Sequence, residues 1–165
     1  MNLSGLKMFD NSDLQDKIML RNKAFEYFDV IPDVLDLFCG QCVISNKLWS
    51  NISCQVMCID KKKQHDKLSE NINRITGDNN GYIYLAKDYD IIDCDAYGLV
   101  MPFIKKLANK NKGKLIFFTD GTPTRQIRFK NATAEFKRHI DDVNPIHIEY
   151  FLNRRKTAYY GLMVI

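Results

Sequence analysis

The stretch LDLFCGQCVIS, residues 35–45, decides how this sequence folds. An apolar run containing one acid, Asp36, leads into the short CGQC loop, and a helix is expected directly after it. A strand–loop–helix segment of this kind has three possible roles. It can carry a redox pair of cysteines, contribute ligands to a metal site, or bind a nucleotide-type ligand through the backbone of the loop at the helix N-terminus. The rest of the sequence discriminates among these three interpretations.

Length and composition bound the kind of protein. The 165 residues, 45% of them hydrophobic, fit a single domain over residues 1–165, with residues 1–30 as an N-terminal helical cap. No apolar run reaches about 18 residues and no signal peptide is recognisable, so we expect a cytoplasmic protein without membrane contact. The five cysteines are then expected to be free thiols. A net charge of +4 permits a polyanionic partner without requiring one.

Predicted strands and helices alternate along the chain. Residues 12–28 have helical spacing, with Ser12 as the N-cap. Strands are expected at 33–38, 55–60, 89–95 and 114–120, and helices at 43–49, 61–72 and 99–110. Two β-rich runs, 146–153 and 156–165, predict an antiparallel hairpin. The pattern indicates an α/β fold with helices on both faces of a mostly parallel sheet, which binds ligands at the carboxyl ends of its strands.

The cysteines have the spacing of a metal site or of a redox pair. Cys39, Cys42, Cys54 and Cys58 have a zinc-like spacing, but two cysteines at 54 and 58 on one strand would start about 13 Å apart, at roughly 3.3 Å per residue. That is too far to share one ion, so no metal is expected. A thioredoxin-type CxxC pair also lies between a strand and a helix. That fold needs a cis-proline loop and a final helix, whereas this chain closes with a hairpin.

Two acids give the loop its third interpretation. Asp36 lies four residues before Gly40, and Asp60 closes the next strand, 24 residues after Asp36. Gly40 lets backbone N–H groups approach a ligand, while an acid at the tip of the second strand accepts hydrogen bonds from both ribose hydroxyls. An acid ahead of the glycine would repel a pyrophosphate. It suits a cofactor that carries an amino-acid ammonium or a sulfonium.

DLFCGQCVIS followed by QVMCID resembles the first two motifs of the class I S-adenosylmethionine-dependent methyltransferases, and YDIIDCDAYG resembles their fourth motif. The resemblance covers about residues 30–165. It implies a Rossmann-like methyltransferase fold, with a mostly parallel seven-stranded sheet and a C-terminal antiparallel hairpin, and S-adenosylmethionine as the cofactor. The residues it assigns to that cofactor are Asp36 below the methionine part, Phe38, Cys39 and Gly40 around it, Asp60 at the ribose, and Lys61 beside Asp60. The family usually has glycine in place of Cys42, which implies a less open loop and weaker or absent cofactor binding.

The adenine contact has two candidates. GYIYLAKD has the propensity of a strand, which would make Asp88 the acid near the adenine. The crossover from the third to the fourth strand needs roughly a dozen residues, which that assignment does not leave. A short strand is therefore expected at 72–75, with Asp78 at its tip as the adenine candidate and 82–87 as the crossover. Asp88 is the alternative.

The fourth motif carries the expected chemistry. DCDAYG resembles the strand tip of methyltransferases that act on exocyclic amines of nucleobases, most closely the D-P-Y/F-G of tRNA guanine-N2 methyltransferases. By this resemblance Asp95 accepts the hydrogens of the amine and Tyr97 stacks on the base, so that positioning and electrostatics supply the acceleration. Ala96 replaces the proline that stiffens this turn. In the alternative, Asp93 and Asp95 end the strand and cap the next helix.

RNA or DNA is the expected partner. If the first strand of the hairpin runs parallel to the earlier strands, its turn lies on the same rim as Gly40 and Asp95. Basic side chains there would contact phosphates; they are Arg125, Arg128, Arg154 and Arg155. The chain leaves no room for a recognition domain, so a large RNA would require a homodimer or a partner subunit. Cys42 and Ala96 also permit a different function, a catalytically inactive methyltransferase-like binding or partner subunit.

Overall fold

Seven strands form one mixed sheet in the computed structural model, which describes residues 13–53, 55–63, 67–96, 98–121, 129–153 and 155–165. The strand order is β3-β2-β1-β4-β5-β7-β6. The strands are β1 (Val34–Leu37), β2 (Val56–Asp60), β3 (Ile72–Thr76), β4 (Ile91–Asp95), β5 (Leu115–Asp120), β6 (His147–Leu152) and β7 (Tyr159–Val164). Strands β1 to β5 pair in parallel, whereas β7 is antiparallel to β5 and β6. The expected sheet and its C-terminal antiparallel hairpin are confirmed.

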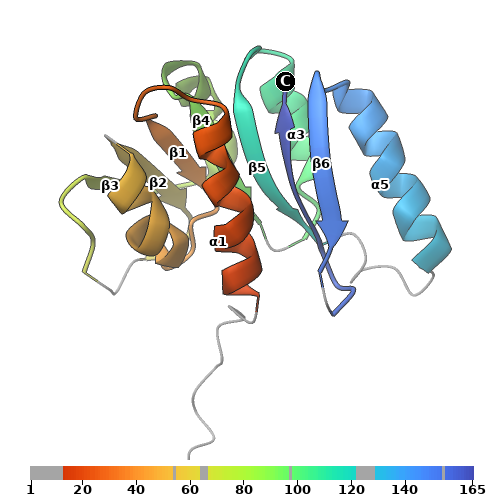
Figure 1. The fold of residues 1–165 in the computed structure, drawn as a ribbon, viewed down its shortest axis with the longest axis horizontal. Coiled ribbons are helices and arrows are strands. Elements are labelled where there is room, and N and C mark those ends of the chain that lie inside the picture. The colour runs from red at the N-terminus through yellow and green to blue at the C-terminus, as the bar shows by residue number, and fades with distance from the viewer. Residues whose placement is uncertain (1–12, 54, 64–66, 97, 122–128, 154) are drawn as a thin grey trace, which may run out of the picture.

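Helices cover both faces of the sheet (Figure 1). They are α1 (Leu14–Asn22) with the 3₁₀ turn η1 (Lys23–Glu26), the π-helical segment η2 (Ser45–Trp49) with α2 (Ser50–Ile52), the 3₁₀ helix η3 (Asn79–Asp88), α3 (Met101–Ala108) and α5 (Phe129–Val143). Helix α1 crosses the front of the sheet in Figure 1, whereas α3 lies behind it. None of the helices within the described part of the chain combines the length and the apolar character needed to span a bilayer.

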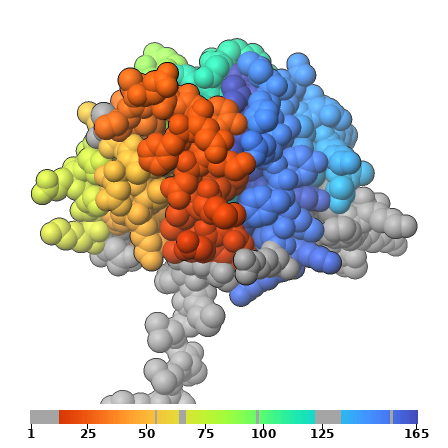
Figure 2. Space-filling model, in the orientation of Figure 1, coloured from red at the N-terminus to blue at the C-terminus, as the bar shows by residue number. Residues whose placement is uncertain are grey.

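The central strands are apolar on both sides because both of their faces are covered. All four residues of β1 and all six of β5 are buried. On one face, Leu20 and Ala24 from the first helical segment pack with Trp49 and Phe117. On the other face, Phe103 of α3 and Phe136 of α5 belong to a second core. Figure 2 shows α1 as a continuous band, with η2 and α2 on one side of it and the C-terminal hairpin on the other.

Several local expectations need correction. Helix α5 was not predicted, although Phe136, Ile140 and Val143 are buried at helical spacing. The helix expected at 61–72 is wrong, because the described residues of that connection are not helical and β3 already begins at Ile72. The helix expected at 12–28 ends in the 3₁₀ turn η1, and Ser12 lies outside the described residues. The short third strand and the crossover after Asp78 are confirmed.

The thioredoxin-type interpretation fails on the fold. The sheet has seven strands, and the part of the chain that the structure describes contains no cis peptide bond. A thioredoxin-type site would require a cis-proline opposite the cysteine pair. The loop at residues 38–42 therefore lies in a sheet whose ligand site is expected at the carboxyl ends of the parallel strands.

Candidate cofactor loop and the buried acid cluster

The loop after β1 bends sharply over the end of β2. The backbone N–H groups of Phe38 and Cys39 donate to the carbonyl of Ile59 at 3.0 and 3.4 Å, and Cys42 N–H closes a turn onto the carbonyl of Cys39 at 2.7 Å. Phe38, Gly40 and Cys42 have φ values of 69°, 55° and 55°. No atom lies within 4 Å of the place where a Cβ on Gly40 would be. The backbone at Gly40 is therefore open to an approaching group, as a cofactor loop requires.

Asp60 joins this loop to the tip of β2. Its carboxylate accepts the backbone N–H of Gly40 at 2.9 Å and that of Lys62 at 2.8 Å, one on each oxygen. Each carboxylate oxygen can accept a second hydrogen bond. The structure thus brings together Gly40 and Asp60, the two residues on which the loop interpretation depends, at one edge of the sheet.

Asp36 lies inside the protein, below the loop. Its side chain is buried, the hydroxyl of Ser45 donates to Oδ2, and Oδ1 has no hydrogen-bond partner among the described residues. Asp36 is also the register partner of Asp93 on β4, so the two carboxylates lie on one face of adjacent strands. Burial first, and then the charge of Asp93, raises the pKa of Asp36 well above its ordinary value.

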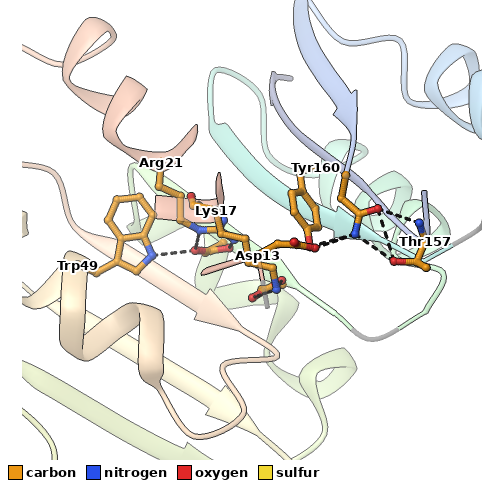
Figure 3. Close-up of polar contacts among 9 residues, drawn as sticks. Asp13, Lys17, Arg21, Trp49, Thr157 and Tyr160 are labelled. Atoms are coloured by element: carbon orange, nitrogen blue, oxygen red, sulfur yellow. Dashed lines mark hydrogen bonds and ion pairs between the residues drawn. The ribbon is translucent and has the colours of Figure 1, made fainter. Parts of the chain in front are cut away.

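The sequence does not reveal a buried ionic cluster that is centred on Asp93. Figure 3 labels two of its members, Arg21 and Trp49. Arg21 of α1 binds both oxygens of Asp93 at 2.6 Å, and both side chains are fully buried. The indole N–H of Trp49 donates to the same carboxylate at 2.8 Å. Burial alone would lower the pKa of Arg21, but Asp93, together with Asp95 and Asp36, raises it above its ordinary value, so this guanidinium stays charged. Helix α1 is therefore attached to the middle of the sheet by a bidentate ion pair.

Asp95, the expected acceptor for the substrate amine, is also paired with α1. The ammonium of Lys17 contacts its two oxygens at 2.7 and 2.9 Å, and the Asp95 side chain is 18% exposed. Burial alone would raise the pKa of Asp95, but the charges of Lys17 and Arg21 lower it below its ordinary value. Lys17 Nζ also lies 5.5 Å from the centre of the Tyr160 ring. Asp95 is accordingly an ionised hydrogen-bond acceptor at neutral pH.

The start of α1 is fixed to the C-terminal hairpin. Asp13, just before the helix, accepts hydrogen bonds from the hydroxyl of Tyr160 and the side-chain amide of Asn153, both at 2.9 Å (Figure 3). The same Asn153 accepts the backbone N–H of Thr157 at 2.8 Å. The segment expected to be a cap is thus bonded to β4, to the end of β6 and to β7.

The acid that caps helix α3 is Asp120, and not Asp93 or Asp95. Asp120, at the end of β5, accepts the backbone N–H groups of Val100 and Met101 at 2.9 and 3.1 Å, where α3 begins. Asp93 and Asp95 are bound to Arg21 and Lys17 of α1 instead. The signal for Asp120 was its place at a strand tip, the same feature that identified Asp60.

Of the two adenine candidates, Asp78 lies at the rim. The carbonyl of Asp60 accepts the backbone N–H of Gly77 at 3.0 Å, which places the tip of β3 beside that of β2. Asp78 caps η3 by accepting the N–H of Asn80 at 3.0 Å and pairs with Lys61 at 3.0 Å. These contacts, the Asn80 bond foremost, lower the pKa of Asp78 to about 2. Asp88 ends η3 three residues before β4 begins, at the opposite end of the sheet.

The remaining predicted site residues are described only in part. Tyr97, Arg125, Arg128 and Arg154 lie outside the described residues. Arg155 is exposed in the turn between β6 and β7. Because β6 pairs antiparallel with β7 and β7 antiparallel with β5, β6 runs parallel to β5. The hairpin turn therefore lies on the carboxyl rim, as the sequence predicted.

The sulfurs of Cys39, Cys42 and Cys58 lie within 4.8 Å of one another. Arg74 on β3, the register partner of Cys58, donates through Nη1 to the sulfurs of Cys39 and Cys42, each at 2.9 Å. Hydrogen bonds from Cys39 and Cys58, and then Arg74, lower the pKa of Cys42 to about 3. The spacing of Cys54 and Cys58 along the sequence excludes a shared ion for those two residues, but β2 carries Cys58 beneath the loop, close to Cys39 and Cys42. Cys54 lies outside the described residues.

Solved structures match this fold, whereas no protein-family profile and no curated protein sequence matches the chain. The N-methyltransferase NodS of Bradyrhizobium japonicum, in complex with S-adenosyl-L-homocysteine, matches with a TM-score of 0.62 and 12% identity over 99% of this chain and 92% of its own. The S-adenosylmethionine-dependent methyltransferase SibL, in its apo form, matches with a TM-score of 0.60 and 12% identity over 93% of this chain and 55% of its own. The chain has the fold of class I methyltransferases.

The same fold also serves other reactions. Precorrin 8W decarboxylase of Methanobacterium thermoautotrophicum matches with a TM-score of 0.54 and 15% identity over 88% of this chain and 87% of its own. Two further matching structures, one of them from Streptococcus mutans, are about twice as long, since the chain spans 48% of each. Identities this low show the fold alone, so the activity must be argued from the residues of the site.

Replacing Arg21 by methionine should destabilise the protein strongly. Asp93 would keep only the Trp49 donor for a fully buried charge, which is expected to cost about 3–5 kcal/mol of the free energy of unfolding. The matched control is Lys105→Met, which removes an exposed pair with Asp142 and should change that free energy by less than about 1 kcal/mol. Urea unfolding followed by far-ultraviolet circular dichroism measures both. Equal effects of the two variants would contradict the assigned role of Arg21.

Asp36→Asn should stabilise the protein increasingly as the pH rises. Because the pKa of Asp36 is raised in the folded state, its contribution to stability is complete below the unfolded pKa of about 3.9 and is lost as the pH rises through the folded pKa. Asparagine cannot ionise, so the variant's advantage should grow from about pH 4 upward. Urea unfolding at a series of pH values measures it. The control Asp142→Asn, at a site where Lys105 lowers the pKa, should show the opposite trend, and parallel curves for Asp36→Asn and the wild type would refute the assignment.

Proposed function

We propose that this chain is an S-adenosylmethionine-dependent methyltransferase whose cofactor lies across the carboxyl ends of β1 and β2. One observation carries the proposal: the open backbone of Gly40 is hydrogen-bonded to the carboxylate of Asp60, in the loop that follows β1 and its buried acid Asp36. The sheet order and the shared fold with methyltransferases agree with it.

The residues at this edge fit the cofactor's chemistry. Asp60 has acceptor capacity left for the ribose hydroxyls beside its two backbone bonds. Oδ1 of Asp36 is a buried acceptor without a partner among the described residues, below the place proposed for the methionine part. Asp78, at the tip of β3, is the acceptor proposed for the adenine, with Lys61 bound to it. When bound, S-adenosylmethionine supplies an electrophilic methyl group on a sulfonium.

We propose an exocyclic amine of a nucleobase in RNA or DNA as the methyl acceptor. Asp95 is ionised and 18% exposed at the tip of β4, so it can accept hydrogens from an amine and orient the nitrogen lone pair. Tyr97 would stack on the base. The proposed phosphate contacts are Arg125, Arg128, Arg154 and Arg155, of which Arg155 lies in the hairpin turn on this rim.

A second candidate function has its own observation. Lys17 already occupies both oxygens of Asp95, and Cys42 takes the place usually held by glycine in a left-handed backbone conformation. A methyltransferase-like domain in which an internal lysine neutralises the acceptor acid would bind cofactor or a partner protein without transferring a methyl group. A homodimer or a partner subunit would then supply substrate recognition or activity.

Asp60→Ala should abolish most of the affinity for S-adenosylhomocysteine. The change removes the acceptor for two ribose hydroxyls, and at roughly 1.5 kcal/mol for each bond to a charged group the dissociation constant should rise by about a hundredfold. Isothermal titration calorimetry with wild type, Asp60→Ala and the distant control Asp142→Ala measures this. Unchanged affinity in Asp60→Ala would refute its role, and an absence of binding by the wild type at millimolar ligand would favour another ligand.

Asp95→Ala should keep the affinity for S-adenosylhomocysteine and lower methyl transfer by about a hundredfold or more. Transfer is measured as tritium moved from labelled S-adenosylmethionine to RNA, DNA and protein extracts. The matched variant Lys17→Met breaks the same ion pair but leaves the acid in place, so it should retain far more transfer than Asp95→Ala. Equal losses would mean that the pair is only structural. Cofactor binding without labelling of any extract would favour the second candidate function.

A further inference from the structure

Three cysteine sulfurs converge under the cofactor loop from two separate segments. Cys39 and Cys42 belong to the loop, whereas Cys58 comes from the middle of β2, and the parallel pairing of β1 with β2 brings them together. The three sulfur atoms lie within 4.8 Å of one another. Among the residues that the structure describes, these three cysteines form the one cluster of at least three possible metal ligands. All three thiols are free.

The distances suit a metal ion. Zinc binds thiolate sulfur at about 2.3 Å, so three sulfurs of a tetrahedral site lie about 3.8 Å apart. The three sulfurs here lie no more than 4.8 Å apart, and an approach of about 1 Å or less would close the site. Cys42 and Cys58 are fully buried, while Cys39 is partly exposed, which leaves one side for an ion to enter.

Arg74 supplies the outer contacts that such a site needs. Its guanidinium donates to Cys39 and Cys42, and its Nη2 donates to the carbonyl of Lys62 at 2.5 Å, which fixes its position. With Zn²⁺, the ion and the guanidinium together balance the charge of three thiolates; with Cu⁺, one negative charge remains. Cys58 in turn contacts the hydroxyl of Ser45 at 3.2 Å. Outer hydrogen bonds of this kind orient metal-binding sulfurs and strengthen binding.

The backbone indicates that the side chain of Cys42 has a use. Its φ of 55° is a conformation that favours glycine, and a side chain there costs about 1 kcal/mol. The Cys42 side chain is buried, and its sulfur lies close to the sulfurs of Cys39 and Cys58. The space next to Gly40 stays empty. A cysteine that keeps this conformation in spite of its cost supports a role for the Cys42 sulfur in binding an ion.

We propose that Cys39, Cys42 and Cys58 form a binding site for one thiophilic metal ion, Zn²⁺ or Cu⁺, which fastens the loop between β1 and η2 to β2. Both ions favour cysteine sulfur and tolerate three such ligands with an open or absent fourth position. Binding displaces the protons that remain on the three sulfurs, and these protons leave to solvent. The site does not depend on the proposed methyl transfer, because it uses none of the oxygens assigned to the cofactor.

The test uses the full chain, purified with a non-thiol reductant and without added cofactor. Zn²⁺ and Cu⁺ are titrated separately against a chromophoric chelator, and Co²⁺ reports thiolate ligands by charge-transfer absorption. We expect one equivalent of Zn²⁺ or Cu⁺ per chain and a thiolate band with Co²⁺. Cys39→Ser, at the partly exposed position, should weaken binding at least tenfold. The control Cys94→Ala changes a buried cysteine of the opposite core and should bind as the wild type does.

Circular dichroism of both variants checks that each is folded, and the Co²⁺ spectrum of the wild type needs no variant at all. Binding of neither Zn²⁺ nor Cu⁺, or equal affinity in Cys39→Ser and Cys94→Ala, would overturn the proposal, because the three sulfurs would then serve only to satisfy Arg74. Zn²⁺ without Cu⁺, or Cu⁺ without Zn²⁺, would identify the ion. Failure of S-adenosylhomocysteine binding would leave this result unaffected, so the two proposals fail separately.

Discussion

The bidentate pair between Arg21 and Asp93 is the interaction on which the rest of the structure depends. Asp36, Asp93 and Asp95 occupy one face of two neighbouring central strands, and neighbouring strands lie only about 4.8 Å apart. Three acids in that position repel one another and resist burial. Helix α1 supplies Arg21 and Lys17, the cations that pair with Asp93 and Asp95. The sheet can therefore keep acids at its centre only while α1 covers them.

The fold followed from local patterns and connection lengths. Apolar runs located β1, β2, β4 and β5, and the need for a crossover placed the third strand at 72–75, where β3 lies, instead of at 81–88. The acids at the strand tips, Asp60 and Asp78, could be found because the end of a strand is visible in sequence. Helix α5 was missed although its helical spacing was equally visible.

The partners of the buried acids could not be inferred from the sequence in the same way. Arg21 and Lys17 lie four residues apart on one side of α1, and in a sequence such residues look like a solvated helix face. Only packing α1 across β4 turns that face inward. The cysteine cluster was missed for the same reason, since it depends on the register between β1 and β2 rather than on spacing along the chain.

The loop at 38–42 has two sides with different chemistry. On one side Gly40 presents open backbone and its N–H group to Asp60; on the other, the sulfurs of Cys39 and Cys42 contact Arg74. Cys42 is fully buried, so it takes no room beside Gly40, where the sequence alone implied a less open loop. A cysteine instead of a glycine at position 42 therefore adds contacts that hold the loop in place. It does not narrow the space beside Gly40.

The pairing of Lys17 with Asp95 bears on the proposed methyl transfer through the protonation state of the acid. By lowering the pKa of Asp95, Lys17 and Arg21 make it a weak base that remains an acceptor at neutral pH. Transfer of a methyl group from a sulfonium to an amine needs the nitrogen lone pair to be aimed rather than a proton to be removed first, so a weak base is no obstacle. Each oxygen of Asp95 can accept a further hydrogen bond beside the one from Lys17. An ion pair that would silence a general base thus leaves a hydrogen-bond acceptor able to act.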